Sequence, residues 1–392
     1  MRYIRKNSNY HIMKRFILFL SLTVFFYVDR SFAQQTIYDT LTINNLDRDM
    51  IVYVPATYNA STPVPLVFNF HGYTSNAFQQ MFYGDFRAIA DTANFILVHP
   101  NGTLDNTNTT HWNVGFGGST VDDVSYIDQL IDSLLLDYAI DTQRIYATGM
   151  SNGGYFSYRL ACELSERITA MASVTGSMTP VTQFGCATSH PMPVMQIHGT
   201  ADGVVPYAGD TWTLAVEQVV DLWVSFNQCD TTPQVFNVPN VSITDGCTAT
   251  SYSYLNGSNG SEVVLYRIDN GGHTWPGAPF NVGVTNYDFN ASLVIWQFFQ
   301  KFRLDNLILS NRSLPGEMNT HSKIHCFPNP VADKVTISST SELGMVEVFH
   351  VSGQCVYSAN CMNHTLTLDL SQWARGMYIF KAVGQYQRII KE

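Results

Sequence analysis

The residues with the clearest chemical potential are Gly149-Met150-Ser151-Asn152-Gly153, in which a serine stands between two glycines. Residues 145–148 before it are strand-like, and residues 155–163 after it have helical periodicity. A strand that turns directly into a helix strains the serine backbone, and the flanking glycines leave the necessary room. The pattern predicts a nucleophilic serine beside helix N–H groups that could stabilise an oxyanion. Alone, however, it recurs by chance in Gly- and Ser-rich chains.

A serine nucleophile needs a base and an acid that orients the base. Asp202 follows the strand-like residues 193–199, and His273 lies in the glycine-bounded loop 271–277 after the next strand. Both would reach the sheet edge that carries Ser151, in the chain order serine, acid, histidine. We therefore expect His273 to take the Ser151 proton and Asp202 to orient the imidazole. The competing acids and bases, among which we assign His198 a structural role, are Asp210, Asp221, Asp245, His190 and His198.

An oxyanion hole would complete this site. The N–H of Asn152, directly after the nucleophile, is one expected donor. The N–H of Tyr73 or of Thr74 is the other, since both follow the strand ending at Phe70, and Gly72 allows close approach. Trp112, Thr74 and Trp275 are the candidates for contact with substrate. For Trp112, whose ring could flank an aromatic or sugar ring, packing within its own loop is the alternative.

The elements that must position these residues alternate between strand and helix. Continuous apolar runs indicate strands buried on both faces. Together they predict an α/β fold over residues 34–305, with a mostly parallel sheet covered by helices on both faces. The strand-like segments, beginning with a hairpin, are 36–54, 63–70, 95–100, 145–148, 170–176, 193–199 and 263–268; the helical ones are 85–93, 122–135, 155–163, 211–226 and 291–302.

The pattern changes after Arg303. Residues 306–324 lack periodicity and contain Ser, Asn, Pro and Gly, which indicates a linker. Residues 325–392 contain only short strand-like segments separated by turns, which predicts a small all-β sandwich.

The amino terminus has the features of a secretory signal. From a start at Met1 or Met13, Lys14-Arg15 precedes an apolar run and a small-residue cleavage site at Ser31-Phe32-Ala33, so residues 1–33 would be removed on export. The apolar run is too short to span a bilayer, so no integral membrane segment is expected afterwards. A formal charge of −10, without a basic run after the leader, argues against nucleic acid as a partner.

The seven cysteines all follow this leader, which predicts disulfides in an exported protein. The sequence-local pairing of the first four joins Cys162 with Cys186 and Cys229 with Cys247. The odd number in the tail, Cys326, Cys355 and Cys361, leaves their pairing open. Because no cysteine or histidine pair has the spacing of a zinc site, we expect no metal.

Several blocks in fixed order resemble the extracellular esterase family of polyhydroxybutyrate depolymerases, feruloyl esterases and acetylxylan esterases. They cover about residues 36–303. The resemblance implies a triad of Ser151, Asp202 and His273. It also implies an α/β-hydrolase fold, and the elbow looks closer to those of the plant-cell-wall esterases and of depolymerase-like secreted esterases of unsettled substrate. We expect no cofactor. The blocks are Asn101-Gly102, Trp112-Asn113, residues 121–124, 141–146 and 149–154, residues 198–202, and Gly272-His273-Thr274-Trp275-Pro276-Gly277.

The tail resembles the type A sorting domain of type IX secretion. The residues that carry this resemblance are 327–330, 346–349, Gly353, 368–371, 376–378 and 389–391. The resemblance implies passage through the periplasm of a Gram-negative bacterium to the cell surface or medium, with the secretion machinery as a partner. A carbohydrate-binding sandwich is the alternative for this tail.

We therefore expect a secreted serine carboxylic-ester hydrolase that acts on polymeric or oligomeric esters. Feruloyl or acetyl esters of plant-cell-wall xylan are the leading substrates, and polyhydroxybutyrate is the alternative. Two other classes stay open. One is a serine peptidase or acyltransferase on the same fold, and the other is a non-catalytic surface-binding protein.

Overall fold

The computed structural model describes residues 34–43, 45–308, 324–339, 341–350, 355–382 and 385–392. The expected leader, residues 1–33, lies outside these ranges, as does most of the expected linker. Helix α8 (Leu304–Ile308) continues past the expected domain end at residue 305, so the first linker residues are helical. Within the described ranges, no helix is both long and apolar enough to cross a bilayer.

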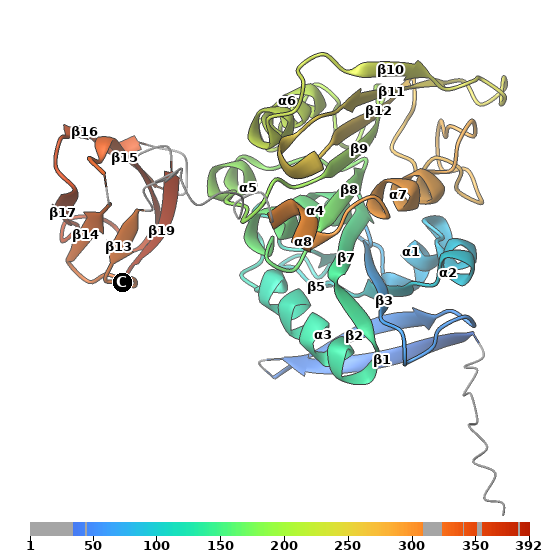
Figure 1. The fold of residues 1–392 in the computed structure, drawn as a ribbon, viewed down its shortest axis with the longest axis horizontal. Helices are drawn as coiled ribbons and strands as arrows, with labels where there is room; N and C mark the ends of the chain where they lie inside the picture. Colours follow the sequence, from blue (N-terminus) through green and yellow to red (C-terminus); the bar gives the residue numbers. More distant parts are fainter. Residues whose placement is uncertain (1–33, 44, 309–323, 340, 351–354, 383–384) are drawn as a thin grey trace, which may run out of the picture. The chain divides into compact units, whose positions relative to one another are not determined.

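The first part of the chain is built on one large sheet (Figure 1). Its six central strands, from β4 to β12, run parallel, and antiparallel pairs flank them on both sides. In sheet order the ten strands are β1 (Gln35–Ile43), β2 (Leu46–Val54), β4 (Ile96–Pro100), β3 (Val64–Phe70), β7 (Ile140–Met150), β8 (Ala170–Val174), β9 (Val194–Gly199), β12 (Val263–Asp269), β11 (Thr248–Tyr254) and β10 (Gln234–Asn237).

Helices cover both faces of this sheet (Figure 1). On β3, Leu66 and Phe68 pack into one core with α3, α4 and α6, whereas Val67 between them packs into a second core with α2 and α7. Side chains of a strand alternate between its faces, so a strand covered on both faces is apolar along most of its length. The predicted α/β fold is confirmed. The helices are α1 (Ala77–Tyr83), α2 (Arg87–Ala93), α3 (Asp123–Asp137), α4 (Asn152–Glu163), α5 (Pro180–Gly185), α6 (Val216–Asn227) and α7 (Ala291–Phe299).

Several elements were not expected from the sequence, among them α1, β10 and β11. Helix α1 exposes Phe78 and Phe82 while it buries Ala77 and Met81, so its apolar residues do not form the single stripe of an amphipathic helix. Strand β10 is exposed along its whole length at the sheet edge. Strand β11 is a run of Thr, Ser, Ala and Tyr, in which apolar alternation is weak.

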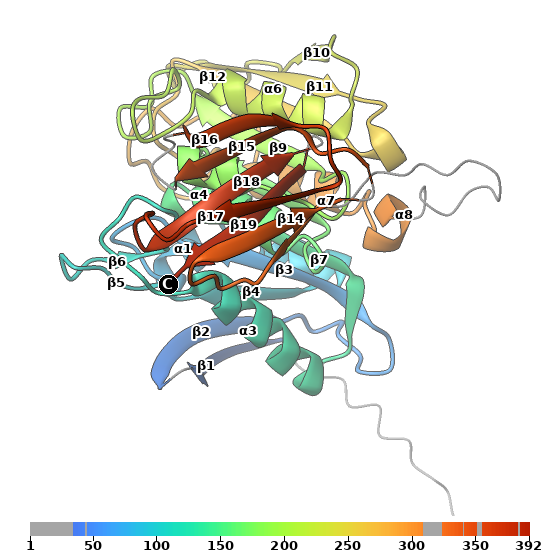
Figure 2. The ribbon, with the colours of Figure 1, turned by 90° about the vertical axis from the view of Figure 1, so that its left-hand side faces the viewer.

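The C-terminal part is all-β, as predicted (Figure 2). One sheet has the order β13 (His325–Phe327), β14 (Lys334–Ser338) and β17 (Thr365–Asp369). The other has the order β16 (Cys355–Cys361), β15 (Gly344–His350), β18 (Gly376–Ala382) and β19 (Gln385–Lys391). Alternating residues such as Val346 and Val348 on β15 fill a small core of their own.

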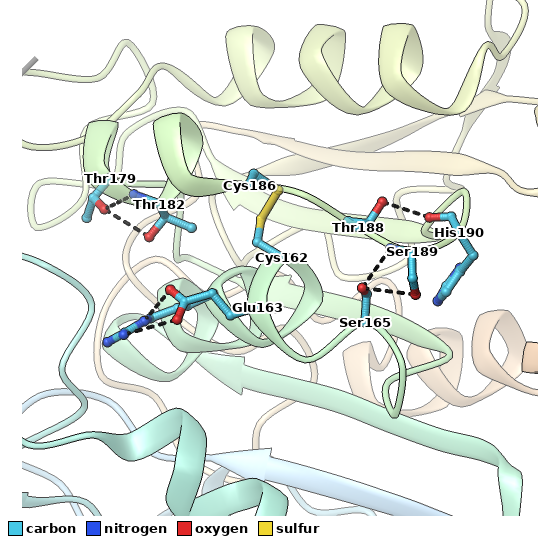
Figure 3. The surroundings of a disulfide bond; sticks show 10 residues. Cys162, Glu163, Ser165, Thr179, Thr182, Cys186, Thr188, Ser189 and His190 are labelled. Carbon is cyan, nitrogen blue, oxygen red and sulfur yellow. Dashed lines mark hydrogen bonds and ion pairs between the residues drawn. A yellow bond between two sulfur atoms is a disulfide. The ribbon is translucent and has the colours of Figure 1, made fainter. Parts of the chain in front are cut away.

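One predicted disulfide is present and one is not. Cys162, on α4, is bonded to Cys186, which follows α5 (Figure 3). The pairing of Cys229 with Cys247 was wrong, because both are free and buried. Cys247 directly precedes β11, whereas the neighbour of Cys229, Asp230, hydrogen-bonds Leu255 just beyond its other end. The strand keeps the two thiols roughly 20 Å apart.

Candidate active site

Ser151 occupies the sharp turn between β7 and α4. Its φ of 54° and ψ of −121° lie outside the regions that ordinary residues adopt, which costs on the order of 1–3 kcal/mol. The turn is held by hydrogen bonds from Ser151 N to Val174 O, 2.8 Å, and from Tyr155 N to Ser151 O, 3.0 Å. A Cβ on Gly149 or Gly153 would lie 2.6 or 2.2 Å from the carbonyl oxygen of Phe70. The elbow therefore needs both glycines.

Asp202 and His273 come together from two neighbouring strands. Asp202 lies three residues after β9, and His273 lies four residues after β12, which pairs with β9 in parallel. Ala201 N donates to Gly271 O at 2.9 Å, which ties the two loops together. His273 Nδ1 and Asp202 Oδ2 are then 2.7 Å apart.

The Asp202 carboxylate is buried but well supplied with donors. The N–H groups of Val204 and Val205 each donate to Oδ1 at 2.8 Å, and His198 Nε2 lies 3.3 Å from Oδ2. Burial raises the pKa of Asp202, but the hydrogen bonds from His198 and His273 outweigh it and hold this pKa well below its usual range. An ionised carboxylate only accepts, so His273 must carry its proton on Nδ1, and Nε2 is left free to accept a proton.

Ser151 lies at the same edge of the sheet as this pair. Met150, at the end of β7, pairs with Val174 of β8, and Val174 pairs with Ile197 of β9. The ends of β7 and β9 are therefore two strand spacings apart, roughly 10 Å. Among the described residues, no hydrogen bond joins the Ser151 hydroxyl to the His273 ring. Contacts of this kind are often long without substrate and shorten when it binds.

The competing bases and two of the three competing acids have other hydrogen-bond partners. His198 is fully buried; its Nδ1 accepts from Gln196 at 2.9 Å, and its Nε2 donates to Val205 O at 2.9 Å. Both nitrogens of His190 contact backbone carbonyls. Among the competing acids, Asp210 and Asp245 accept hydrogen bonds from backbone N–H groups of nearby loops. Asp221 is exposed on α6.

Two of the expected oxyanion donors have no hydrogen-bond acceptor in the described part of the chain. Neither the N–H of Asn152 nor the N–H of Tyr73 donates to any group in the described part of the chain. The N–H of Thr74 donates to Thr110 O at 2.9 Å, so it is not available. A Cβ on Gly72 would lie 3.4 Å from Ser151 Cβ, so the turn that carries Tyr73 packs directly against the candidate nucleophile.

Of the three residues expected to contact substrate, only Trp112 lines the cavity at Ser151. Trp112 is fully buried, and its ring stacks on Phe156 with centroids 4.7 Å apart. Trp275 is 1% exposed, and its Nε1 donates to Ser292 at 3.2 Å within the second core. Thr74 is exposed, with a φ of 69°. Neither Trp275 nor Thr74 lines the cavity at Ser151.

A cavity of about 350 Å³ opens at Ser151. Its walls are mainly apolar, and Tyr155 is fixed there by a hydrogen bond between its hydroxyl and Thr213. Trp212 and Phe116 are 64% and 42% exposed, so both rings are available to a ligand. The apolar and aromatic lining consists of Tyr73, Trp112, Val114, Phe116, Tyr155, Val204, Val205 and Trp212. The sequence singled out only Tyr73 and Trp112 among these. Val114, Phe116 and Trp212 come from loops with no motif, whereas Tyr155, Val204 and Val205 lie just after the elbow and Asp202.

Residues 118–227 match the Phospholipase/Carboxylesterase family. Feruloyl esterase C of Emericella nidulans is 30% identical over 260 residues, which cover 64% of this chain and 83% of that protein. The chain belongs to the feruloyl and acetylxylan esterase family.

Other relatives of this esterase family member share shorter stretches. The bifunctional acetylxylan esterase/xylanase XynS20E of Neocallimastix patriciarum is 30% identical over 174 residues, 44% of this chain. The chain spans only 24% of the length of that relative. In structure, the acetyl xylan esterase from Aspergillus awamori covers 61% of this chain and 94% of its own, with 14% identity and a TM-score of 0.44.

The tail of the chain matches a different family. Residues 325–392 match the secretion system C-terminal sorting domain. The predicted sorting domain is confirmed, and so is the predicted export to the cell surface or the medium.

One part of the site was not anticipated. Residues 122–135 were expected only to form a helix, and Asp122 does cap α3 by accepting from Ser125 N at 3.0 Å. Asp123 instead is fully buried and pairs with Arg48 at 2.7 Å, while its other oxygen accepts from Asn113 N at 2.8 Å. An arginine on the β1–β2 hairpin thus supports the loop beside the elbow. No local pattern links residues 75 positions apart.

Proposed function

We propose that the protein is a secreted serine carboxylic-ester hydrolase with Ser151 as nucleophile, His273 as base and Asp202 as the acid that orients the base. The observation that carries this proposal is the 2.7 Å bond between His273 Nδ1 and Asp202 Oδ2, made at the sheet edge where the strained turn presents Ser151.

The reaction proceeds in two halves. Ser151 Oγ attacks the ester carbonyl carbon while its proton passes to His273 Nε2. The tetrahedral intermediate collapses, the bond to the alcohol oxygen breaks, and His273 returns the proton to that oxygen. A water molecule then attacks the acyl-enzyme with His273 again as base, which releases the acid and restores Ser151. Asp202 remains ionised throughout and stabilises the imidazolium, as its lowered pKa favours.

The oxyanion of both intermediates would be bound by the N–H groups of Asn152 and Tyr73. Both are free to donate, and Asn152 also stands at the first turn of α4, where the helix dipole favours negative charge.

The cavity at Ser151 supports an aromatic acyl group. A volume of about 350 Å³ with exposed Phe116 and Trp212 rings is far larger and more apolar than an acetyl group needs. Relatives named feruloyl esterase and acetylxylan esterase point to the same plant-cell-wall class. We therefore rank feruloyl esters of xylan first, acetylated xylan second and polyhydroxybutyrate as the alternative.

A substrate panel with methyl ferulate, acetylated xylan and polyhydroxybutyrate tests this proposal, with hydrolysis followed by acid release. We expect turnover of methyl ferulate by the wild-type chain and a loss of roughly 10⁴-fold or more in kcat for Ser151→Ala. Ser225→Ala, on the exposed side of α6, should keep wild-type activity. Undiminished ester hydrolysis by Ser151→Ala would refute the mechanism.

The panel also separates the rival classes. Faster cleavage of a matched amide than of the ester would indicate a peptidase, and transfer of the acyl group to an added alcohol in preference to water would indicate an acyltransferase. A chain that neither hydrolyses any ester nor reacts with a fluorophosphonate would be a binding protein on a hydrolase fold.

A further inference from the structure

Trp112 lies between the two segments that carry the candidate oxyanion donors. It follows β6 (Thr110–His111), the second strand of a short hairpin whose first strand is β5 (Thr103–Leu104). Its ring is fully buried, stacks on Phe156, and meets Phe70 edge-on with centroids 5.2 Å apart. Such a tightly packed ring has one available orientation, so the groups attached to it are fixed as well.

The main chain of Trp112 holds the first donor segment. Its N–H donates to Asn152 Oδ1 at 2.6 Å, and Asn152 Nδ2 donates back to Trp112 O at 3.1 Å. Two antiparallel hydrogen bonds define the position and the rotation of the Asn152 side chain. Because the side chain and the N–H of Asn152 belong to one residue, this clamp also fixes the N–H.

The indole of Trp112 holds the second donor segment. Its Nε1–H donates to His71 O at 3.1 Å, two residues before the Tyr73 N–H. The same segment is braced by His71, whose Nδ1 donates to Gly72 O at 2.8 Å and whose Nε2 accepts from Gly102 N at 2.9 Å. The ring of Trp112 thus determines where the turn at Tyr73 begins.

We propose that Trp112 is a positioning residue that sets the distance between the two oxyanion donors, the N–H of Asn152 and the N–H of Tyr73. This inference rests on the proposed esterase function. Donors act on an oxyanion only when each lies about 2.7–3.1 Å from it. A small relative shift of the two segments therefore reduces the stabilisation of the transition state more than it reduces the binding of substrate.

The test is Trp112→Phe, which removes the indole N–H but leaves the main-chain clamp and an aromatic ring over Phe156. We expect kcat on methyl ferulate to fall roughly 10–100-fold while KM stays within about twofold, because one donor is displaced rather than removed. Affinity for a trifluoromethyl ketone analogue of the ester, which forms a tetrahedral oxyanion on the serine, should fall by the same factor as kcat. Unchanged kcat and unchanged analogue affinity would overturn the proposal.

Trp223→Phe is the matched control. Trp223 is 1% exposed on α6, and its Nε1 has no partner in the described part of the chain, so the same substitution shrinks a buried ring without breaking a hydrogen bond. It should lower the melting temperature and leave kcat and the analogue affinity unchanged. Equal kcat losses in both variants would mean a general packing effect, which also overturns the proposal.

Asn152→Ala attacks the clamp from its other side and keeps the main-chain N–H, so it serves if Trp112→Phe does not fold. We expect a comparable loss in kcat at unchanged KM, and a full wild-type kcat would overturn the proposal. When both variants fold, their double variant should lose less than the product of the two single losses, because both act on one unit. An inactive wild-type chain would instead sink the esterase function itself.

Discussion

The buried ion pair between Arg48 and Asp123 allows a stability prediction with a worked magnitude. The two side chains are 3% and 0% exposed and 2.7 Å apart. Arg48→Met leaves the Asp123 carboxylate buried with Asn113 N–H as its remaining partner in the network, and breaking a buried pair in this way costs about 3–5 kcal/mol. The same substitution removes the guanidinium stacked 3.9 Å over the Tyr126 ring, which adds to the loss.

A double variant sharpens the argument. Arg48→Met/Asp123→Leu removes both charges and leaves the Asn113 N–H without its acceptor, at a cost of about 1–3 kcal/mol. The double variant should therefore be more stable than Arg48→Met alone. Lys301→Met is the surface control, because Lys301 is 50% exposed in its pair with Glu262 and the substitution should cost about 0–1 kcal/mol.

Urea unfolding followed by tryptophan fluorescence measures these free energies. Since Asn113 adjoins Trp112, Arg48→Met should also lower kcat at temperatures where the protein remains folded. An Arg48→Met variant that lost less than about 1 kcal/mol, as little as the surface control, would refute the reasoning. A double variant less stable than Arg48→Met would refute it too.

Four further predictions address the disulfide, a buried histidine, the orienting acid and the acyl cavity. The disulfide joins residues 24 positions apart, so the Cys162→Ala/Cys186→Ala variant should lose about 3 kcal/mol of unfolding free energy. Calorimetry should show a fall of roughly 6–12 °C in Tm, and an unchanged Tm would contradict the loop-closure argument. Burial lowers the pKa of His71 to about 4, so the unfolded state binds more protons below pH 6.5 and stability should fall by on the order of 3 kcal/mol between pH 6.5 and 4. In urea titrations at several pH values, the stability of His71→Asn should fall less steeply with pH. If its stability fell as steeply as that of the wild type, His71 would be excluded as the cause. Asp202→Asn should lower kcat about 10⁴-fold with little change in KM, and a kcat loss under tenfold would exclude its orienting role. Trp212→Ala should raise KM for methyl ferulate but not for p-nitrophenyl acetate, and an equal rise for both would remove Trp212 from the acyl cavity.

The sequence predicted those features that leave a local pattern. Strands such as Val64–Phe70 and Val194–Gly199 are buried at every position because helices cover both faces, and that burial is visible in the sequence as a largely apolar run. The Ser151 turn was predictable because only glycine fits at positions 149 and 153. From the sequence, Asp202 and His273 could be named only as candidates. In the structure they are in contact, because neighbouring parallel strands end at the same edge of the sheet.

What the sequence did not predict depends on contacts between distant segments. The role of Asp123 on α3 depends on an arginine in the β1–β2 hairpin, and the burial of Trp112 depends on Phe70 and Phe156. Choosing the nearest partner for Cys229 failed because a whole strand intervenes between it and Cys247. Edge strands such as β10 are exposed on both sides and so carry no burial pattern.

Trapping the acyl-enzyme tests the central claim most directly. Methyl ferulate is mixed with the protein, the reaction is quenched in acid during turnover, and the intact mass and the peptide masses are measured. The account predicts one feruloyl group per chain, on the peptide that contains Ser151, and none in Ser151→Ala. Steady turnover without any covalent adduct, or an adduct on another residue, would contradict it.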